Sequence, residues 1–165
     1  MKIFSAAQIK AWDQYTIRHD SISSIDLMEK AAKAFVDQLL QLYPEEKFLI
    51  FCGSGNNGGD GLAIARLLLQ KKLEVEVWLL KEKELSTDAQ LNCDRLLELD
   101  VRLKIITDAR AVEESEWLRV NAQPLVLIDA LLGTGLNRSV KDGYAELIHR
   151  INATQKKIEA LGGGQ

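Results

Sequence analysis

A cluster of five glycines joins an apolar run to an amphipathic helical pattern, and this junction constrains the fold more than any other stretch. It lies in residues 51–70, FCGSGNNGGDGLAIARLLLQ, at the end of the apolar run FLIFC. A continuous apolar run of this kind predicts a strand that is buried on both faces of a parallel sheet. Glycines directly after it indicate that backbone approaches another group closely. The junction therefore predicts a strand, loop and helix of an α/β fold.

The rest of the chain repeats this alternation of strands and helices. Ser5 and Gln8 have the form of a capping box, which predicts a helix to about His19, and a second helix follows Ser23 and stops at Pro44. Further strands are expected at residues 73–80, 103–107 and 124–130, and further helices at 60–72, 87–99, 113–120 and 141–154. We therefore predict a three-layer α/β/α Rossmann-like sandwich with a mostly parallel sheet, preceded by two N-terminal helices.

The domain organisation follows from the same pattern. Residues 1–158 are expected to form one domain, because no linker or repeat interrupts them. A last strand begins at residues 156–158, but the following EALGGGQ has the composition of a terminal tail. This leads to the hypothesis that residues 159–165 are a shortened or altered C-terminus.

Composition and charge exclude several kinds of partner. The net charge of −3, without a block rich in Lys and Arg, argues against nucleic acid. No apolar run approaches the roughly 20 residues that cross a membrane, and the first residues, MKIF, show no signal peptide. We therefore expect a cytoplasmic protein with no membrane partner, in which Cys52 and Cys93 are reduced structural thiols.

The glycine cluster has the spacing of a phosphate-binding loop. The six residues GSGNNG fit G-x-G-x-x-G between a predicted strand and a predicted helix, where free N–H groups and the helix dipole favour an anion. Asn56, Asn57 and Asp60 add polar side chains to this loop. Simpler roles remain open: Asp60 could cap the helix, and the two asparagines could occupy left-handed turn positions.

An ordinary NAD dehydrogenase is disfavoured by the second strand. That class needs an acidic residue at the end of the strand to bind the ribose hydroxyls. Here the strand ends in Leu80 and Lys81, and Glu82 comes later. We also expect no separate substrate domain within these 165 residues.

A second polar position follows an apolar strand in the stretch LVLIDALLGTGLN. Asp129 closes this strand, at the sheet edge where open α/β folds bind ligands. A carboxylate there is costly unless something pairs with it. One interpretation is a hydrogen bond to the next loop. The other is a functional carboxylate that meets the glycine loop and serves a cation or a proton transfer.

These motifs together resemble a known family, the YjeF N-terminal domain or NAD(P)H-hydrate epimerase family. The similarity extends over nearly the whole chain. It is carried by the motifs GSGNNGGDG and DALLGTGL, in this order, and by the N-terminal stretches FSAAQIKAWDQYTI and ISSIDLMEKAA. The resemblance implies an isomerase of metabolite repair, which interconverts the R and S epimers of hydrated NADH or NADPH. The substrate is then a small dinucleotide.

The resemblance also implies a set of site residues. Asn57 and Asp129 would hold a potassium ion, and Asp129 would lie nearest the chemistry, as proton acceptor or as stabiliser of a cationic intermediate. The implied substrate contacts are Asn56, Asn57, Gly58, Gly59, Asp60, Gly133, Thr134, Gly135, Leu136, Asn137, Arg138 and Ser139.

One departure from the family pattern bears on activity. The family continues with a strand ending in Asp and a Pro-Ser-Gly turn, which supply a ligand contact and a further potassium ligand, whereas this chain reads EALGGGQ. The alternative function is therefore a non-catalytic nucleotide-binding or protein-interaction module of the same fold. The resemblance further implies fusion to, or joint action with, an NAD(P)H-hydrate dehydratase. The apolar surface of the N-terminal helices suggests a homodimer.

Overall fold

One sheet of five parallel strands organises the part of the chain that the structure describes. The computed structural model describes residues 5–19, 22–108, 110, 112–122, 125–133, 140, 142–154 and 157–160. The strand order is β3-β2-β1-β4-β5. The strands are β1 (Phe48–Cys52), β2 (Val75–Leu80), β3 (Arg102–Ile106), β4 (Val126–Ala130) and β5 (Lys157–Ala160). The predicted α/β fold with a parallel sheet is confirmed.

The strand register determines which residues meet at the carboxyl edge of the sheet. The central strand β1 pairs with β2 on one side and β4 on the other, so that Phe51 lies opposite Trp78 and Asp129. Asp129 in turn lies opposite Ala160 of β5. The last strand therefore includes Glu159 and Ala160, and it runs two residues past the boundary expected at residue 158.

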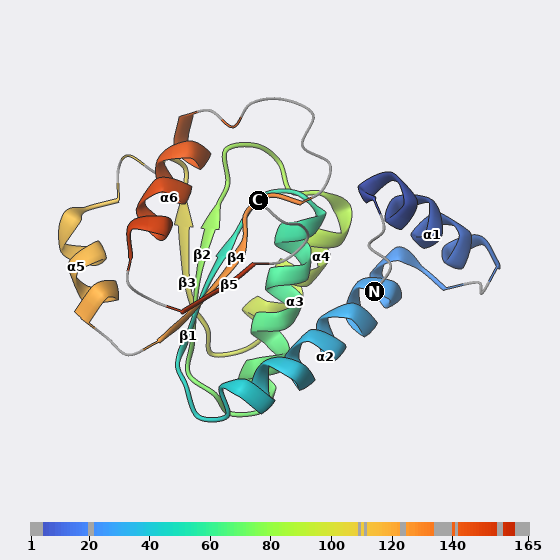
Figure 1. Cartoon of the computed structure of the whole chain (residues 1–165), viewed down its shortest axis with the longest axis horizontal. Helices are drawn as coiled ribbons and strands as arrows, with labels where there is room; N and C mark the ends of the chain where they lie inside the picture. The colour runs from blue at the N-terminus through green and yellow to red at the C-terminus, as the bar shows by residue number, and fades with distance from the viewer. Residues whose placement is uncertain are drawn as a thin grey trace.

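Helices cover both faces of this sheet (Figure 1). On one face lie α2, α3 and α4, and on the other lie α5 and α6. Figure 1 also shows α1 apart from the sheet, beyond α2. The helix bounds are α1 (Ala6–His19), α2 (Ser24–Leu42), α3 (Asn56–Gln70), α4 (Thr87–Leu97), α5 (Glu114–Ala122) and α6 (Asp142–Ala153). The two N-terminal helices precede the sheet as the sequence predicts.

Both predicted helix starts at the N-terminal end are confirmed by side-chain hydrogen bonds. The backbone N–H of Ser5 donates to Oε1 of Gln8 at 2.8 Å, and the N–H of Gln8 donates back to the Ser5 hydroxyl at 3.3 Å, which is a capping box. Ser23 caps α2 by accepting from the N–H of Asp26 at 3.2 Å. These bonds satisfy N–H groups that have no partner within their helix.

Two apolar clusters hold the layers together. The first joins β1 and β2 to α2, α3 and α4, and it contains both Cys52 and Cys93 as free, buried thiols. The second lies beneath α5 and α6 and contains the stacked and edge-on rings of Phe51, Trp78 and Trp117, with centroids 5.4 to 6.0 Å apart. Such aromatic contacts stabilise a core beyond their burial alone.

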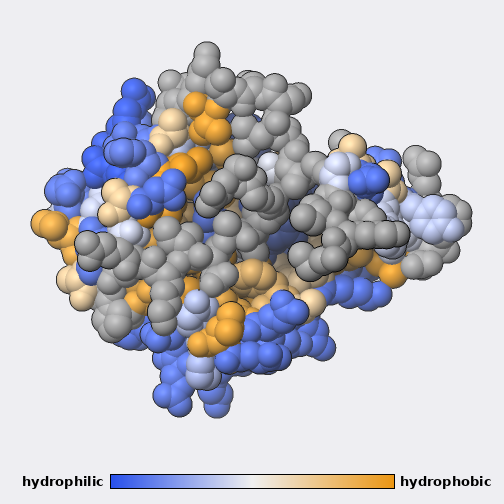
Figure 2. Space-filling model, viewed as in Figure 1, coloured by the Kyte–Doolittle hydropathy of each residue, from blue (hydrophilic) through white to orange (hydrophobic). Residues whose placement is uncertain are grey.

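The outer surface is polar where the helices face away from these clusters. Figure 2 shows hydrophilic side chains along the lower edge of the molecule, where α2 runs in Figure 1. This fits the alternation of buried and exposed positions along α2. Within the described residues, none of the helices combines the length and apolar character that a membrane crossing needs.

Gly61 sets the distance between α3 and the sheet. A Cβ atom at this position would lie 2.6 Å from the Cβ of Ala130 and 2.8 Å from Sγ of Cys52. Because both atoms belong to central strands, neither can move away without disturbing the sheet. The glycine thus lets α3 pack directly on β1 and β4.

We expect Gly61→Ala to lower the free energy of unfolding by about 1–3 kcal/mol, because it overpacks this contact. The comparison is Gly55→Ala: a Cβ there meets nothing within 4 Å and the φ of −92° suits alanine, so we expect only the smaller cost of alanine at a helix cap. Urea unfolding followed by circular dichroism measures both. Equal stability of the two variants would contradict the packing role of Gly61.

Candidate functional site

The loop between β1 and α3 is held in place by Ser54, which is fully buried. Its hydroxyl donates to the carbonyl of Leu80 at the end of β2 at 3.0 Å, and its carbonyl accepts from the N–H of Ser86, the cap of α4, at 2.9 Å. Its own N–H donates to the hydroxyl of Tyr144 on α6 at 3.2 Å. One serine therefore ties the glycine loop to three other segments.

Helix α3 begins at Asn56, four residues before Asp60. Asp60 is therefore in the second turn and does not cap the helix, so the capping interpretation is wrong. The cap position is Gly55, which has no side chain that could accept a hydrogen bond from the helix. The N–H groups of the first turn, which have no partner within the helix, remain available to an anion.

Most glycines of the loop approach other parts of the protein closely. A Cβ at Gly53 would lie 2.1 Å from the carbonyl oxygen of Leu131, and one at Gly58 would lie 1.8 Å from the carbonyl oxygen of Gly53. Gly59 faces Met28 of α2 and the backbone of Ala89 in α4. These contacts explain the cluster by packing within the fold. Gly58 and Gly59 of this cluster are buried, and as glycines they can contact a ligand only through backbone atoms.

Asp129 lies near the carboxyl end of β4, as the sequence predicts. It pairs in register with Phe51 and shares the sheet face of Leu127, which is the face covered by α5 and α6. Its Oδ1 accepts a hydrogen bond from the N–H of Leu131 at 3.0 Å. The hydrogen bond to the following loop, one of the two interpretations of the sequence, is therefore present.

The electrostatic state of Asp129 also fits a functional role. Burial raises the pKa of its carboxyl group above the ordinary value, and the Leu131 N–H opposes this only in part. No described Lys or Arg side chain forms an ion pair with it. A partly buried carboxylate in this state favours a proton or a cation as its partner.

Asn57 joins the glycine loop to the segment that follows Asp129. Its Nδ2 donates to the carbonyl of Leu132 at 3.2 Å, and a Cβ at Gly133 would lie 3.2 Å from the Cβ of Asn57. The two segments therefore meet across the top of the sheet, as predicted. Of the other predicted contacts, Asn56 is exposed at the start of α3, and Asp60 is half-buried. Six more lie outside the described residues: Thr134, Gly135, Leu136, Asn137, Arg138 and Ser139.

The oxygens of this site are those that a hard cation prefers. Asp129 supplies a carboxylate, and Asn57 keeps its amide Oδ1 while its Nδ2 is engaged. In the described ranges, no three or more His, Cys, Asp or Glu side chains gather into one metal-binding group. The donor set thus fits an alkali or similar oxygen-seeking cation.

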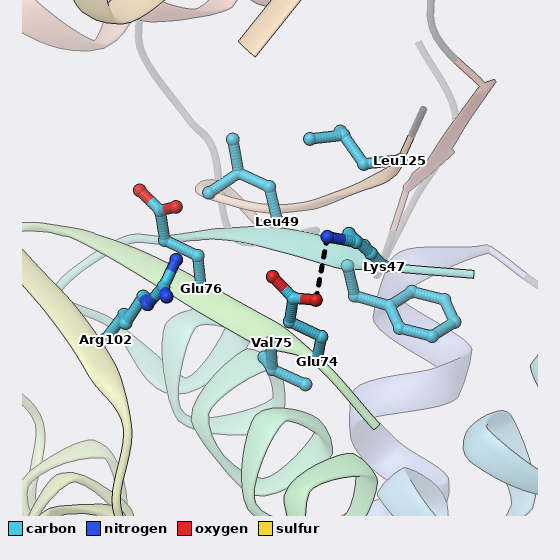
Figure 3. Close-up of a pocket in the computed structure, with 8 residues that line it drawn as sticks. Lys47, Leu49, Glu74, Val75, Glu76, Arg102 and Leu125 are labelled. Atoms are coloured by element: carbon cyan, nitrogen blue, oxygen red, sulfur yellow. Dashed lines mark ion pairs between the residues drawn. The ribbon is translucent and has the colours of Figure 1, made fainter. Parts of the chain in front are cut away.

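A separate pocket lies at the opposite, amino edge of the sheet (Figure 3). Its lining includes the ion pair of Lys47 with Glu74, whose Nζ and Oε2 atoms are 2.8 Å apart, and also Glu76 and Arg102. Its volume of about 20 Å³ has room for about one water molecule. A dinucleotide cannot bind there, so the carboxyl edge remains the candidate site.

Two residues of the site were missed by sequence analysis, Ser54 and Tyr144. Ser54 lies inside the glycine motif, where only its burial distinguishes it from an ordinary loop serine. Tyr144 lies 90 positions further along the chain and reaches the loop only through the tertiary fold. No local pattern in the sequence marks either residue.

Comparison with protein families gives a match over most of the chain. The model described as YjeF-related protein N-terminus matches residues 24–162. This range includes the glycine loop, Asp129 and Tyr144.

Named relatives share this similarity over almost the whole chain. A protein of Limosilactobacillus reuteri named NAD(P)H-hydrate epimerase is 33% identical over 97% of this chain and 72% of its own length. One of the same name from Anaerococcus prevotii is 35% identical over 94% of this chain and 71% of its own. A bifunctional NAD(P)H-hydrate repair enzyme of Salinibacter ruber is 33% identical over 96% of this chain, which spans 31% of that relative.

A solved structure has the same fold. The yeast protein ynu0 superposes with a TM-score of 0.82 at 19% sequence identity, over 98% of this chain and 70% of that one. The α/β architecture is therefore shared with a chain of low sequence identity.

The desolvated carboxyl of Asp129 predicts a specific pH dependence. Because its folded-state pKa is raised, the group favours folding when protonated, and this contribution is lost as the pH rises through the folded pKa. Asp129→Asn keeps an acceptor for the Leu131 N–H but carries no charge. We therefore expect the variant to be at least as stable as the wild type at pH 7, with the difference shrinking toward about pH 4.

Urea unfolding between pH 4.5 and 8, in tetramethylammonium buffer without alkali cations, measures this difference. The control is Asp100→Asn, an exposed carboxylate outside the site, which should leave the pH dependence unchanged. A variant at Asp129 that becomes less stable than the wild type as the pH rises would contradict the expected sign.

Proposed function

The chain belongs to the family of YjeF-related N-terminal domains, and we propose that it is an NAD(P)H-hydrate epimerase. The reaction is the interconversion of the R and S epimers of hydrated NADH or NADPH, in the repair of nicotinamide cofactors. Support comes from relatives with this name that align along nearly the whole chain. The enzyme is thus an isomerase that acts on a small dinucleotide.

The observation that carries this proposal is the hydrogen bond from Asn57 to the carbonyl of Leu132. It joins the glycine loop to the segment after Asp129, and these are the two motifs by which the sequence resembles epimerases. The N–H groups at the start of α3 then face the same edge of the sheet as the carboxylate. Such an arrangement can hold the phosphates of a dinucleotide while presenting a carboxylate to its other end.

We further propose that Asn57 and Asp129 hold a potassium ion. Their amide and carboxylate oxygens suit a hard cation. Burial raises the pKa of Asp129, and no described Lys or Arg side chain pairs with it. When bound, the ion would supply positive charge close to the substrate. Asp129 itself either accepts a proton or stabilises a cationic form of the ring, and both roles require its ionised form.

The proposed substrate contacts combine described and undescribed positions. Asn56 and Asn57 lie at the start of α3, Gly58 and Gly59 offer backbone, and Asp60 and Gly133 flank the same edge. The segment from Thr134 to Ser139 belongs to the proposal through the family resemblance alone.

The named relatives also suggest partners. In bifunctional relatives such as that of Salinibacter ruber, a chain like this one covers about a third of the protein. We therefore propose that this epimerase works with an NAD(P)H-hydrate dehydratase, fused or separate, in the cytoplasm.

A homodimer through α1 is a further part of this proposal. Trp12 and Tyr15 are each 57% exposed and lie three positions apart on that helix, so they share a face. Light scattering of the wild type and of the double variant Trp12→Ser and Tyr15→Ser tests it. A dimeric wild type and a monomeric variant are expected, and a monomeric wild type would overturn it.

The proposed reaction predicts a potassium-dependent epimerase. Purified R-NADHX, followed by chromatography of the two epimers, should interconvert faster than its spontaneous rate in potassium buffer and lose this acceleration in tetramethylammonium. Asp129→Asn should lower the rate by about 100-fold or more, because electrostatic groups at the reacting centre contribute this much. The control Asp100→Asn should keep the wild-type rate.

Two outcomes would revise the proposal. A fully active Asp129→Asn enzyme would remove the role given to this residue and to the cation. A wild type without acceleration that still binds ADP-ribose would support the non-catalytic binding module instead.

A further inference from the structure

Helix α6 contacts the glycine loop through one hydroxyl group. The N–H of Ser54 donates to Oη of Tyr144, and the Tyr144 side chain is half-buried between α6 and the carboxyl edge of the sheet. A Cβ at Gly53 would lie 3.1 Å from the same oxygen. The absence of a side chain at Gly53 is thus one of the conditions that let the phenol reach the loop backbone.

This hydrogen bond satisfies a donor that has no other partner among the described residues. Ser54 is fully buried, and its hydroxyl and carbonyl groups are already engaged by Leu80 and Ser86. A buried N–H without an acceptor is unfavourable, so the loop would have to shift or admit water if the phenolic oxygen were removed. The bond therefore influences where the loop backbone lies.

The orientation of α3 follows from this loop. Asn56 and Asn57 come two and three residues after Ser54, and they begin the helix whose N–H groups face the candidate site. The Asn57 bond to Leu132 is a second contact that fixes this segment. The start of α3 is therefore held by two contacts, that of Asn57 with Leu132 and that of Ser54 with Tyr144.

We propose that Tyr144 is a positioning residue of the dinucleotide site, which acts through the Ser54 N–H to orient the start of α3. This inference rests on the proposed epimerase function and adds to it a residue that none of the sequence motifs includes. The hydroxyl carries the effect, and the ring packs in the second apolar cluster. Removing the hydroxyl should therefore weaken substrate binding and leave the fold intact.

The test compares Tyr144→Phe with Thr154→Val. Both remove one hydroxyl from the α6 region, but Thr154 follows the far end of the helix, and among the described residues its hydroxyl donates to the carbonyl of Ile151. We expect KM for R-NADHX to rise about tenfold in Tyr144→Phe, with a smaller change in kcat, as loss of one hydrogen bond implies. Thr154→Val should keep the wild-type KM, even if its midpoint of thermal unfolding falls as much as that of Tyr144→Phe.

Amide hydrogen exchange gives a second readout that does not need activity. In Tyr144→Phe the Ser54 amide should exchange about tenfold faster. The Gly53 amide, which donates to the carbonyl of Ala130 at 3.1 Å, should stay protected and serves as the internal control.

The outcomes separate this inference from the proposed function. An active wild type with an unchanged KM in Tyr144→Phe would overturn the role of Tyr144 and leave the epimerase function standing. A wild type without epimerase activity would overturn both, whatever the exchange rates. A raised KM in both variants would assign the effect to general stability, which also overturns the positioning role.

Discussion

The parallel pairing of β1 with β4 is the constraint on which the rest of the site depends. It aligns the ends of the two strands, so that the N–H of Gly53 bonds the carbonyl of Ala130 and the glycine loop lies against the segment after Asp129. Because the backbone of Gly53 comes so close to Leu131, no side chain larger than hydrogen fits there. The same close approach that builds the sheet edge also brings the loop and the carboxylate to one place.

A second consequence is electrostatic. Asp129 lies in an apolar strand and keeps a raised pKa, whereas Glu76 of β2 is paired with Arg119 and has a lowered pKa. Among the described residues, Asp129 is thus a desolvated carboxylate at the ligand edge that pairs with no Lys or Arg side chain. An uncompensated group of this kind costs stability, and its retention is typical of sites that bind a cation or move a proton.

Sequence patterns predicted the main features of this site because they are local. An apolar run that is followed by glycines or closed by an aspartate indicates the end of a buried strand. Because parallel strands end at the same edge of the sheet, such ends are expected to lie together. The meeting of Asn57 with the segment after Asp129 followed from that rule. The capping role considered for Asp60 did not follow from it. Gly55 takes the cap position and α3 begins at Asn56, so Asp60 lies in the second turn, where it cannot cap the helix.

The sequence by itself determined the order of strands and helices, the glycine loop and the position of its carboxylate, since periodicity and residue type are properties of neighbouring residues. Only the tertiary structure decided what the glycines approach, which is backbone at Gly53 and Gly58 and side chains of the central strands at Gly61. It also decided that the Tyr144 hydroxyl accepts the Ser54 N–H, a contact between residues 90 positions apart. Contacts of this kind depend on how the layers pack in space, and no spacing along the chain encodes them.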